Sequence, residues 1–563
     1  MASYDYVLKE DNWDTSHDHM DFPDPREIRR CHDRARTICQ KAGISINDIV
    51  TMSPKFWDFN RHLIAVRDSA VTTILTIHWN LCMGTISKFA QHRQDLTRLL
   101  KDLESFNVCG EFLLTEVGHG LDALHLETTA TLQSDGSFKL HTPKSAAAKV
   151  MPPTTPLAGV PRVGVVFARL LANDVDCGVK LFIVPLTNTK QMLPGITSRP
   201  LPRKSGSKAL DHSVTTFNQV RLSPDSLLGS SNPPRNRRTD FLSQIWRVSV
   251  GTLSLSMVNI PALRQAAFIA GTYSLRRHVA SNIPGQRVPI ISFSTQYRPI
   301  LNALAQAIVF DAFADDAIEM FLNPNHSSVV HQGVATCFKA TVTAAAQVTL
   351  SELIDRCGWQ GLFGYNQIVE IALSLRGNSI AEGDYTVLCI RLASEILLGR
   401  YELPPAEMKD CLLARHEAGV WQEARETMAS IAKSGHRHKA YNSNVLPRSR
   451  ALVQATGHRM AYEAAARKGN ISPEILNLFE STCITSGDMS WYCGNGDATR
   501  QDLLARDVEA ADALLPRLKE LLSETGAAPW TTAPIASQEG WDEFIGRLPV
   551  YRYNDSSHER ARL

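Results

Sequence analysis

A carboxylate beside a glycine is the pattern in this sequence that most directly suggests catalysis. It occurs in the run Ala381-Glu382-Gly383-Asp384-Tyr385-Thr386. A buried carboxylate has a raised pKa and can remove a proton from a substrate, and a neighbouring glycine lets the backbone approach closely. The alternative is an acidic residue at the start of a helix, where the helix dipole favours negative charge. Taken alone, the pattern fits that structural role better than the catalytic one.

A second group of candidate residues lies upstream, in Leu114-Thr-Glu-Val-Gly-His-Gly120, followed by Leu126-Glu-Thr-Thr-Ala130. Gly118 and Gly120 would let a loop pass close to a bound group or form a tight turn, and both can hold. Thr115 could bind a ligand, or it could be a strand threonine satisfied by backbone groups. We expect His119 to be a packed loop histidine rather than a catalyst.

A third group combines arginines with a glycine turn. It comprises Arg276-Arg277, then Phe293-Ser-Thr-Gln296, then Cys357-Gly358 with Gly361. The guanidinium group suits phosphate geometry, so this group could hold a phosphorylated ligand. A surface arginine is the alternative for either member of the Arg276-Arg277 pair.

Taken in order, these segments resemble the acyl-CoA oxidases, a branch of the acyl-CoA dehydrogenase superfamily. They are similar to the family's Thr-Glu-x-Gly-His-Gly…Leu-Glu-Thr-Thr-Ala, Arg-Arg…Phe-x-Thr-Gln and Cys-Gly-Gly-x-Gly…Glu-Gly-[Asp/Glu]-Asn-Thr signatures. Weaker likeness extends from His78 to Tyr553, which is nearly the whole chain. The resemblance implies FAD-dependent α,β-dehydrogenation of an acyl-CoA or related acyl thioester, with O2 accepting the electrons.

The resemblance also implies a role for each matching residue. Glu382 would be the base that removes the α-proton, its own backbone N–H would hold the thioester oxygen, and Gly383 would let the backbone approach closely. Because part of the flavin site would come from a neighbouring subunit, we expect at least a homodimer. The implied binding residues are Thr115, Gly118, Gly120 and Thr386 for flavin; Arg277, Gln296, Gly358 and Gly361 for the flavin of the neighbouring subunit; and Arg247 for coenzyme A.

The chain departs from the family pattern along the flavin wall. Where the family has Lys-Trp-Trp-Pro-Gly-Gly, this chain has Lys149-Val-Met-Pro-Pro-Thr154, and Pro153 has no N–H to offer. These changes suggest an unusual acyl group, bulky or branched, from a biosynthetic pathway. Two alternatives stay open: a catalytically idle subunit that pairs with an active homologue, and a non-oxidative proton transfer on a β-keto or polyene thioester. Further departures are Leu121, Trp359, Gln360 and Tyr385.

Composition narrows the partners. The net charge is +2 over 563 residues, so charge implies no nucleic acid or anionic membrane partner. The 11 cysteines form no CxxC pair, so we expect reduced thiols and no metal site. We expect no membrane span, and Met1 to Asp24 is too polar and acidic for a signal or transit peptide. Ala561-Arg562-Leu563 is similar to a peroxisomal address, so we expect a peroxisomal protein, otherwise a cytoplasmic one.

The elements that must position these residues suggest an α+β fold like that of the acyl-CoA dehydrogenases and oxidases, with a small β-barrel-like domain between helical ones. Charge spacing predicts a helix over residues 25–42, and apolar residues predict helices over 65–89, 94–103 and again from Phe241 onward. Strand patterns lie between these regions, at 128–132, 138–141, 163–171, 179–185 and 213–222. We expect an N-terminal helical domain over 1–105, a β domain over 106–229, a helical bundle with the base over 240–400, and an extra helical domain over 401–563.

Overall fold

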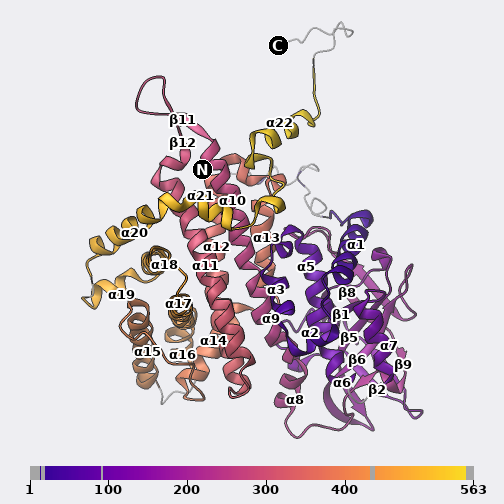
Figure 1. The fold of residues 1–563 in the computed structure, drawn as a ribbon. Coiled ribbons are helices and arrows are strands. Elements are labelled where there is room, and N and C mark those ends of the chain that lie inside the picture. Colours follow the sequence, from indigo (N-terminus) through magenta and orange to yellow (C-terminus); the bar gives the residue numbers. More distant parts are fainter. Residues whose placement is uncertain are drawn as a thin grey trace.

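The computed structural model describes residues 5, 13, 20–90, 93–431, 438–496 and 498–552. Figure 1 shows the N-terminal helices and the strands packed together on one side of the molecule. The long central helices and the C-terminal helices form the other side (Figure 1). The tripeptide Ala561-Arg562-Leu563 lies outside the described residues.

The N-terminal helices begin where the sequence provides caps. Asp24 accepts a hydrogen bond from Arg26 N, and Pro25 occupies the first turn, so α1 starts as predicted. The apolar run expected as one helical segment is divided, with a π-helix in the middle that the sequence did not predict. The elements are α1 (Pro25–Lys41), α2 (Ile46–Thr51), α3 (Pro54–Arg61), α4 (Ile64–Arg67), α5 (Ser69–Thr76), the π-helix Ile77–Met83, α6 (Gly84–Ala90) and α7 (Asp95–Glu104).

The strands form a seven-stranded sheet, in which β1 pairs with β5, and a separate three-stranded sheet with order β4-β8-β7. The predicted hairpin is confirmed, since β2 and β3 are antiparallel with Thr129 opposite His141. The alternating stretch expected from 213 to 222 is instead two strands in different sheets. The strands are β1 (Cys109–Leu113), β2 (Thr129–Leu132), β3 (Phe138–His141), β4 (Lys149–Pro153), β5 (Arg162–Ala172), β6 (Val175–Thr187), β7 (Ile196–Pro200), β8 (His212–Phe217), β9 (Val220–Leu222) and β10 (Leu227–Leu228).

The central helices are interrupted by a hairpin that the sequence did not predict, β11 (His278–Ala280) and β12 (Arg287–Pro289). It projects from the end of the bundle (Figure 1). The helices are α8 (Arg237–Gln244), α9 (Trp246–Met257), α10 (Asn259–Arg276), α11 (Ser294–Leu322), α12 (Ser328–Arg356), α13 (Ile368–Ile380) and α14 (Tyr385–Leu397).

One segment of this bundle corrects the expectation that no apolar run could span a bilayer. Trp246–Arg276, which covers α9 and α10, is long and apolar enough by length and composition. However, 89% of its most apolar window is buried inside the protein, which is typical of a core helix.

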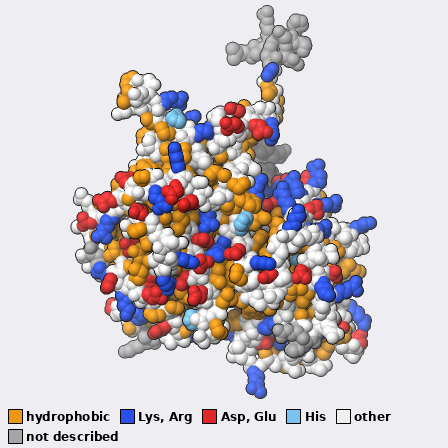
Figure 2. All heavy atoms as spheres, in the orientation of Figure 1, with side chains coloured by type: hydrophobic (Ala, Val, Ile, Leu, Met, Phe, Trp, Pro, Cys, Tyr) orange, Lys and Arg blue, Asp and Glu red, His pale blue; other side chains and the backbone are white. Residues whose placement is uncertain are grey.

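The C-terminal helices pack on the outer side of the bundle, and α17 and α18 contact α11 (Figure 1). The C-terminal stretch is helical, as expected, and its last helix, α22, lies after Gly526. Acidic and basic side chains are interspersed over the face shown in Figure 2, in keeping with the small net charge. The helices are α15 (Leu412–Ile431), α16 (Lys439–Asn444), α17 (Ser449–Arg467), α18 (Pro473–Ser486), α19 (Met489–Gly494), α20 (Arg500–Leu514), α21 (Leu518–Glu524) and α22 (Gln538–Gly546).

Candidate active site

The loop between α13 and α14 holds Glu382 in an unusual backbone conformation. Glu382 has φ = 53°, and Gly383 follows with φ = 98°. Left-handed backbone at a residue other than glycine is strained and clusters at functional sites. The helix-start alternative for Glu382 does not hold, because Asp384 caps α14 by accepting hydrogen bonds from Thr386 N and Val387 N. The acid is thus presented ahead of the helix.

Buried side chains hold all three consecutive carbonyl groups of this loop. Lys339 Nζ donates to Ala381 O at 2.6 Å and to Gly383 O at 2.7 Å. Thr252 Oγ1 donates to the carbonyl of Glu382 at 2.8 Å and shares its single proton with Val248 O, 2.9 Å away in its own helix. The N–H groups of Glu382 and Gly383, in contrast, have no hydrogen-bond partner in the part of the chain that the structure describes. The loop therefore offers unpaired donors beside the acid.

The Glu382 carboxylate points toward the π-helix and α9. Asn80 Nδ2 donates to Glu382 Oε2 at 3.2 Å and also to Arg247 O at 3.1 Å. A side chain at Gly251 would collide with the acid, since its Cβ would lie 1.1 Å from Glu382 Oε2. Asn80 Oδ1 is buried and has no hydrogen-bond partner among the described residues, so an acceptor stands ready beside the protonated acid.

The surroundings of Glu382 make its carboxylate a stronger base than an exposed one. Although the residue as a whole is half-buried, its carboxylate is packed between buried groups. Burial raises the pKa of Glu382 to about 8, while the charges of Lys339 and Arg247 and the Asn80 hydrogen bond act in the opposite direction. An acid with a pKa in this range suits general-base catalysis.

Arg247 does not fit the coenzyme A contact expected from the sequence. Its side chain is fully buried, and its guanidinium donates to Asn80 O at 2.9 Å and to Ile49 O at 3.0 Å. Burial lowers its pKa to about 9, against the charge of Glu382. A phosphate cannot reach a group enclosed in this way, so we correct its role: Arg247 ties α9 to the π-helix that carries Asn80.

The loop of Thr115, Gly118 and Gly120 follows β1 and is held in place by buried contacts of Glu116. Glu116 and Lys149 form a fully buried ion pair with Nζ and Oε1 3.0 Å apart. Glu116 also accepts hydrogen bonds from Glu127 N and Thr128 N. Thr115 is half-buried and follows the end of β1 rather than lying within it, and its carbonyl accepts a hydrogen bond from Val150 N. This loop is linked to Glu382 through β1, which packs on the π-helix.

Glycines 118 and 120 differ in their surroundings. A Cβ at Gly118 would lie 3.0 Å from the Ala146 side chain, so the loop there is tightly packed. Gly120 is exposed, with nothing within 4 Å of a Cβ. As expected, His119 is a loop histidine paired with a neighbour, 2.8 Å from Glu127.

The altered wall segment is distorted where the family motif has its aromatic residues. The β4–β8 pairing is irregular between Val150 and Pro153, and Met151 has φ = 83°. Arg162 donates to Pro153 O at 2.6 Å, which fixes the wall from the buried side. Apolar side chains that face solvent surround the Thr115 loop: Val117 (55% exposed), Leu121 (73%) and Met151 (45%).

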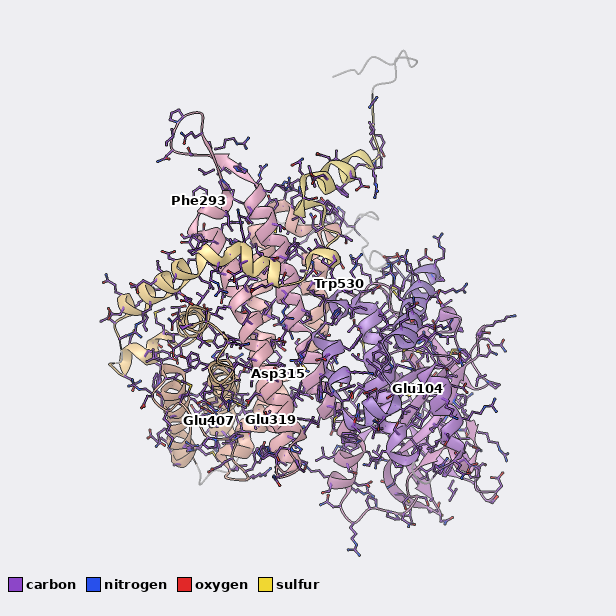
Figure 3. All side chains as sticks on the ribbon, viewed as in Figure 1. Glu104, Phe293, Asp315, Glu319, Glu407 and Trp530 are labelled. Carbon is purple, nitrogen blue, oxygen red and sulfur yellow. The ribbon has the colours of Figure 1, made fainter. Side chains whose placement is uncertain are left out.

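The third group of candidate residues assembles at the end of the bundle marked by Phe293 in Figure 3. Gln296 Nε2 donates to Ser274 Oγ and to Arg356 O, next to the Gly358 turn. Arg277 is exposed, whereas Arg276 is tied to the C-terminal segment through Gln538 and Ile535. A Cβ at Gly361 would lie 2.1 Å from Ile354 O, and Gly358 has φ = 58° in open space.

Within one chain, this group does not meet Glu382. Gly358 and Gly361 precede α13, and Glu382 follows its last residue. The 13 residues of α13 separate them by about 20 Å, at about 1.5 Å per residue. Thr386, half-buried in the first turn of α14, lies on the Glu382 side. The structure thus places the predicted residues in separate clusters within one chain.

Sequence reasoning missed the residues that hold Glu382. They are Asn80, Gly251, Thr252 and Lys339. A signal was present for two of them, since Asn80 and Lys339 are isolated polar residues in otherwise apolar stretches. Such residues need a partner when they are buried, but the sequence does not show which one.

The chain is similar in sequence to acyl-CoA oxidases. Residues 251–397 match the model of the acyl-CoA oxidase C-alpha1 domain. Acyl-coenzyme A oxidase 2, peroxisomal, of Arabidopsis thaliana is 25% identical over 407 residues, covering 67% of this chain and 57% of that protein. Peroxisomal acyl-coenzyme A oxidase 1 of the same plant is 27% identical, covering 56% and 50%. The chain therefore spans about half the length of these relatives.

Solved structures share the fold over nearly the whole chain. Acyl-CoA oxidase 1 from Yarrowia lipolytica aligns with a TM-score of 0.77 at 18% identity, covering 99% of this chain and 93% of that one. Acyl-CoA oxidase-1 from Caenorhabditis elegans, solved with FAD and ATP, gives 0.76 at 18% identity, covering 94% and 88%. The expected fold class, helical domains around a small β domain, is confirmed.

Proposed function

Because this chain is a divergent relative of the acyl-CoA oxidases, we propose that it is an FAD-dependent oxidoreductase that introduces an α,β double bond into an acyl thioester. The observation that carries the proposal is the loop at Glu382. It combines an enclosed acid with a pKa of about 8 and the unpaired N–H groups of Glu382 and Gly383. A carbon acid next to a carbonyl needs this pairing of a base with an oxyanion donor.

In this proposal, Glu382 removes the α-proton while the backbone N–H groups receive the thioester oxygen, where negative charge develops. The C–H electron pair becomes the new double bond as the β-hydrogen leaves with its electrons. When bound, FAD would accept that hydride, and O2 would reoxidise it to give hydrogen peroxide. Asn80 would steady the carboxylate before proton transfer and, through Oδ1, accept from the carboxylic acid afterwards.

The residues around Thr115 fit a flavin ring. Val117 and Met151 leave apolar surface open to solvent, which a planar ring would cover, and Thr115 supplies a half-buried hydroxyl. The Glu116–Lys149 pair stiffens the loop from behind. We propose Thr115, Gly118, Gly120 and Thr386 as its contacts.

The separation of the clusters supports a homodimer. Arg277, Gln296, Gly358 and Gly361 lie at the opposite end of α13 from Glu382, so they fit a ligand that is bound mainly by another chain. Exposed Arg277 offers a guanidinium suited to a pyrophosphate. We therefore propose that each subunit completes the flavin site of its partner.

The distorted wall favours an unusual substrate. Met151 and Pro153 replace an aromatic residue and a glycine of the family motif, and the strand that carries them is irregular, so the shape of the proposed flavin wall is altered. We propose a bulky or branched acyl group, carried on coenzyme A or a protein-tethered arm. The same wall favours, as a second candidate, a proton transfer without oxidation on a β-keto or polyene thioester, because Pro153 offers no N–H toward a flavin.

Two of the relatives carry the word peroxisomal in their names, and we propose this compartment for the chain. A fluorescent fusion with a free C-terminus should then co-localise with a peroxisomal marker. A diffuse signal would reject this compartment.

Absorbance and product analysis test the function itself. The purified protein should show a flavin spectrum, consume O2 and release peroxide with acyl-CoA substrates of differing length and branching. A colourless protein that takes up no FAD on titration would exclude the oxidase. Exchange of the α-proton with solvent deuterium in that protein would support the non-oxidative candidate instead. If the protein shows neither oxidation nor proton exchange, and an active homologue co-purifies with it, it is an idle subunit.

A further inference from the structure

Lys339, on α12, is a buried cation without a paired carboxylate. Its side chain is fully buried, and no ion pair joins it to an acid among the described residues. Burial lowers its pKa to about 8, against the charges of Glu382 and Asp384. Burying a cation without a carboxylate partner costs free energy, so a lysine at this position calls for a functional explanation. The hydrogen-bond acceptors of Lys339 are the carbonyl groups of Ala381 and Gly383, on either side of Glu382.

Those partners connect Lys339 to the oxyanion donors through single peptide groups. The carbonyl of Ala381 and the N–H of Glu382 belong to one peptide unit. Likewise, the carbonyl of Glu382, which accepts from Thr252, shares a peptide unit with the N–H of Gly383. A donor at the oxygen of a peptide group polarises it and strengthens the N–H at its other end. The charge of Lys339 makes its effect the larger one.

We propose that Lys339 is a positioning residue that acts through the Ala381–Glu382 peptide group to strengthen the N–H that receives the thioester oxygen, and that also favours the ionised form of the Glu382 carboxyl. Thr252 does the same, more weakly, for the Gly383 N–H. The inference rests on the proposed function and deepens it by assigning the support of the oxyanion site.

The two contributions can be separated by ligand. Acetoacetyl-CoA binds with enolate character, so its oxygen tests the N–H donors. An S-alkyl-CoA thioether of the same chain length lacks the carbonyl oxygen and tests only the fit of the remaining groups. Binding of both is measured by calorimetry on the flavin-loaded protein, with circular dichroism as the check on folding.

Lys339→Met should lower the affinity for acetoacetyl-CoA about 10- to 100-fold. The affinity for the thioether should change less than about threefold. Thr252→Val, which keeps the side-chain shape, should weaken acetoacetyl-CoA by roughly three- to tenfold. Lys180→Met is the control, because Lys180, on β6, is also buried but forms an ion pair with Asp240 on α8. Equal loss for both ligands would overturn the proposal, since a general distortion would act on both.

A further measurement does not depend on substrate. Infrared difference spectroscopy, with Glu382→Gln as the reference, follows ionisation of the Glu382 carboxyl. In Lys339→Met this ionisation should move to higher pH, whereas Thr252→Val should leave it nearly unchanged. If Lys339→Met does not fold, the ligand discrimination of Thr252→Val decides, and no discrimination overturns the proposal. A protein without thioester binding but with the infrared shift would reject the proposed function and the oxyanion role, and would keep only the effect of Lys339 on the Glu382 carboxyl.

Discussion

Glu382 and Gly251 interlock: the carboxylate oxygen Oε2 of Glu382 lies 1.1 Å from where a Cβ of residue 251 would be. The acid therefore reaches into α9 only because that helix has no side chain at this position. Asn80 closes the same space from the π-helix, with Nδ2 2.8 Å from the absent Cβ. The orientation of the acid is thus set by elements from three distant parts of the sequence.

Gly251→Ala should displace the carboxylate without unfolding the protein. The methyl group cannot coexist with Glu382 Oε2, so the acid must rotate away from Asn80. We expect kcat/KM to fall by about 100-fold or more, because small misplacements of a catalytic group are costly. Gly494→Ala, in open space, is the matched control. Unchanged turnover in Gly251→Ala would show that this orientation of the acid is not the productive one.

Glu382→Gln should remove the base and keep the site. The amide has nearly the same shape but cannot accept the α-proton, so we expect turnover to fall by about 100- to 10,000-fold. Flavin content, measured from the absorption spectrum, should match the wild type. Exposed Glu352→Gln serves as the control. Activity that survives in Glu382→Gln would assign the base elsewhere.

The pH dependence follows from the raised pKa of Glu382. The carboxylate is the active form, so kcat/KM should rise with pH and level off above about pH 8. Rate profiles for wild type with a slow substrate, to keep chemistry limiting, measure this directly. A profile that is already flat from pH 5 upward would contradict an enclosed acid.

The same shift has a consequence for stability. The folded-state pKa of Glu382 lies above its unfolded value, so the folded protein binds an extra proton between about pH 4.5 and 8. Its contribution to stability is complete below the unfolded pKa and falls as pH rises through this window. Glu382→Gln removes this term. Its melting temperature relative to wild type should therefore increase from pH 5 to pH 7.5, and a constant difference would refute the shift.

Breaking the buried Glu116–Lys149 pair should be strongly destabilising. Lys149→Met leaves Glu116 as a buried charge without its cation, which costs about 3–5 kcal/mol. Urea unfolding measures the change, and the exposed pair Arg517–Glu520 provides a control through Arg517→Met. The double variant Lys149→Met with Glu116→Gln should recover part of the loss. If Lys149→Met costs no more than Arg517→Met, the pair does not brace the loop.

The neighbouring arginines at the end of α10 should separate by role. Arg277 is exposed, so Arg277→Ala should weaken FAD binding roughly tenfold with little effect on melting. Arg276 donates to Gln538 and Ile535, so Arg276→Ala should loosen the C-terminal segment, with limited proteolysis as the readout. The reverse assignment of effects would reject the proposed flavin contact.

Much of the fold could be predicted from local pattern. Asp24 with Pro25 marks the start of α1, and Asp135-Gly136 marks the β2–β3 turn, because caps and tight turns depend on adjacent residues. Longer-range features were not visible. The stretch from 213 to 222 was expected as one strand, but its halves pair in different sheets, since strand pairing depends on distant partners.

By itself, the sequence determined which residues are candidates: the Glu382-Gly383 run, the Thr115 loop and the arginine group follow from residue type, order and motif. Only the tertiary structure decided how they are arranged. It enclosed the acid between Asn80 and Gly251 and bonded Lys339 to the carbonyl groups of its loop. It also buried Arg247 and placed the glycine turn of the arginine group about 20 Å from the acid, at the other end of α13. The reason is physical. Residue type fixes what chemistry a group can perform, but its pKa and its partners depend on the burial and charge contributed by distant segments once they pack.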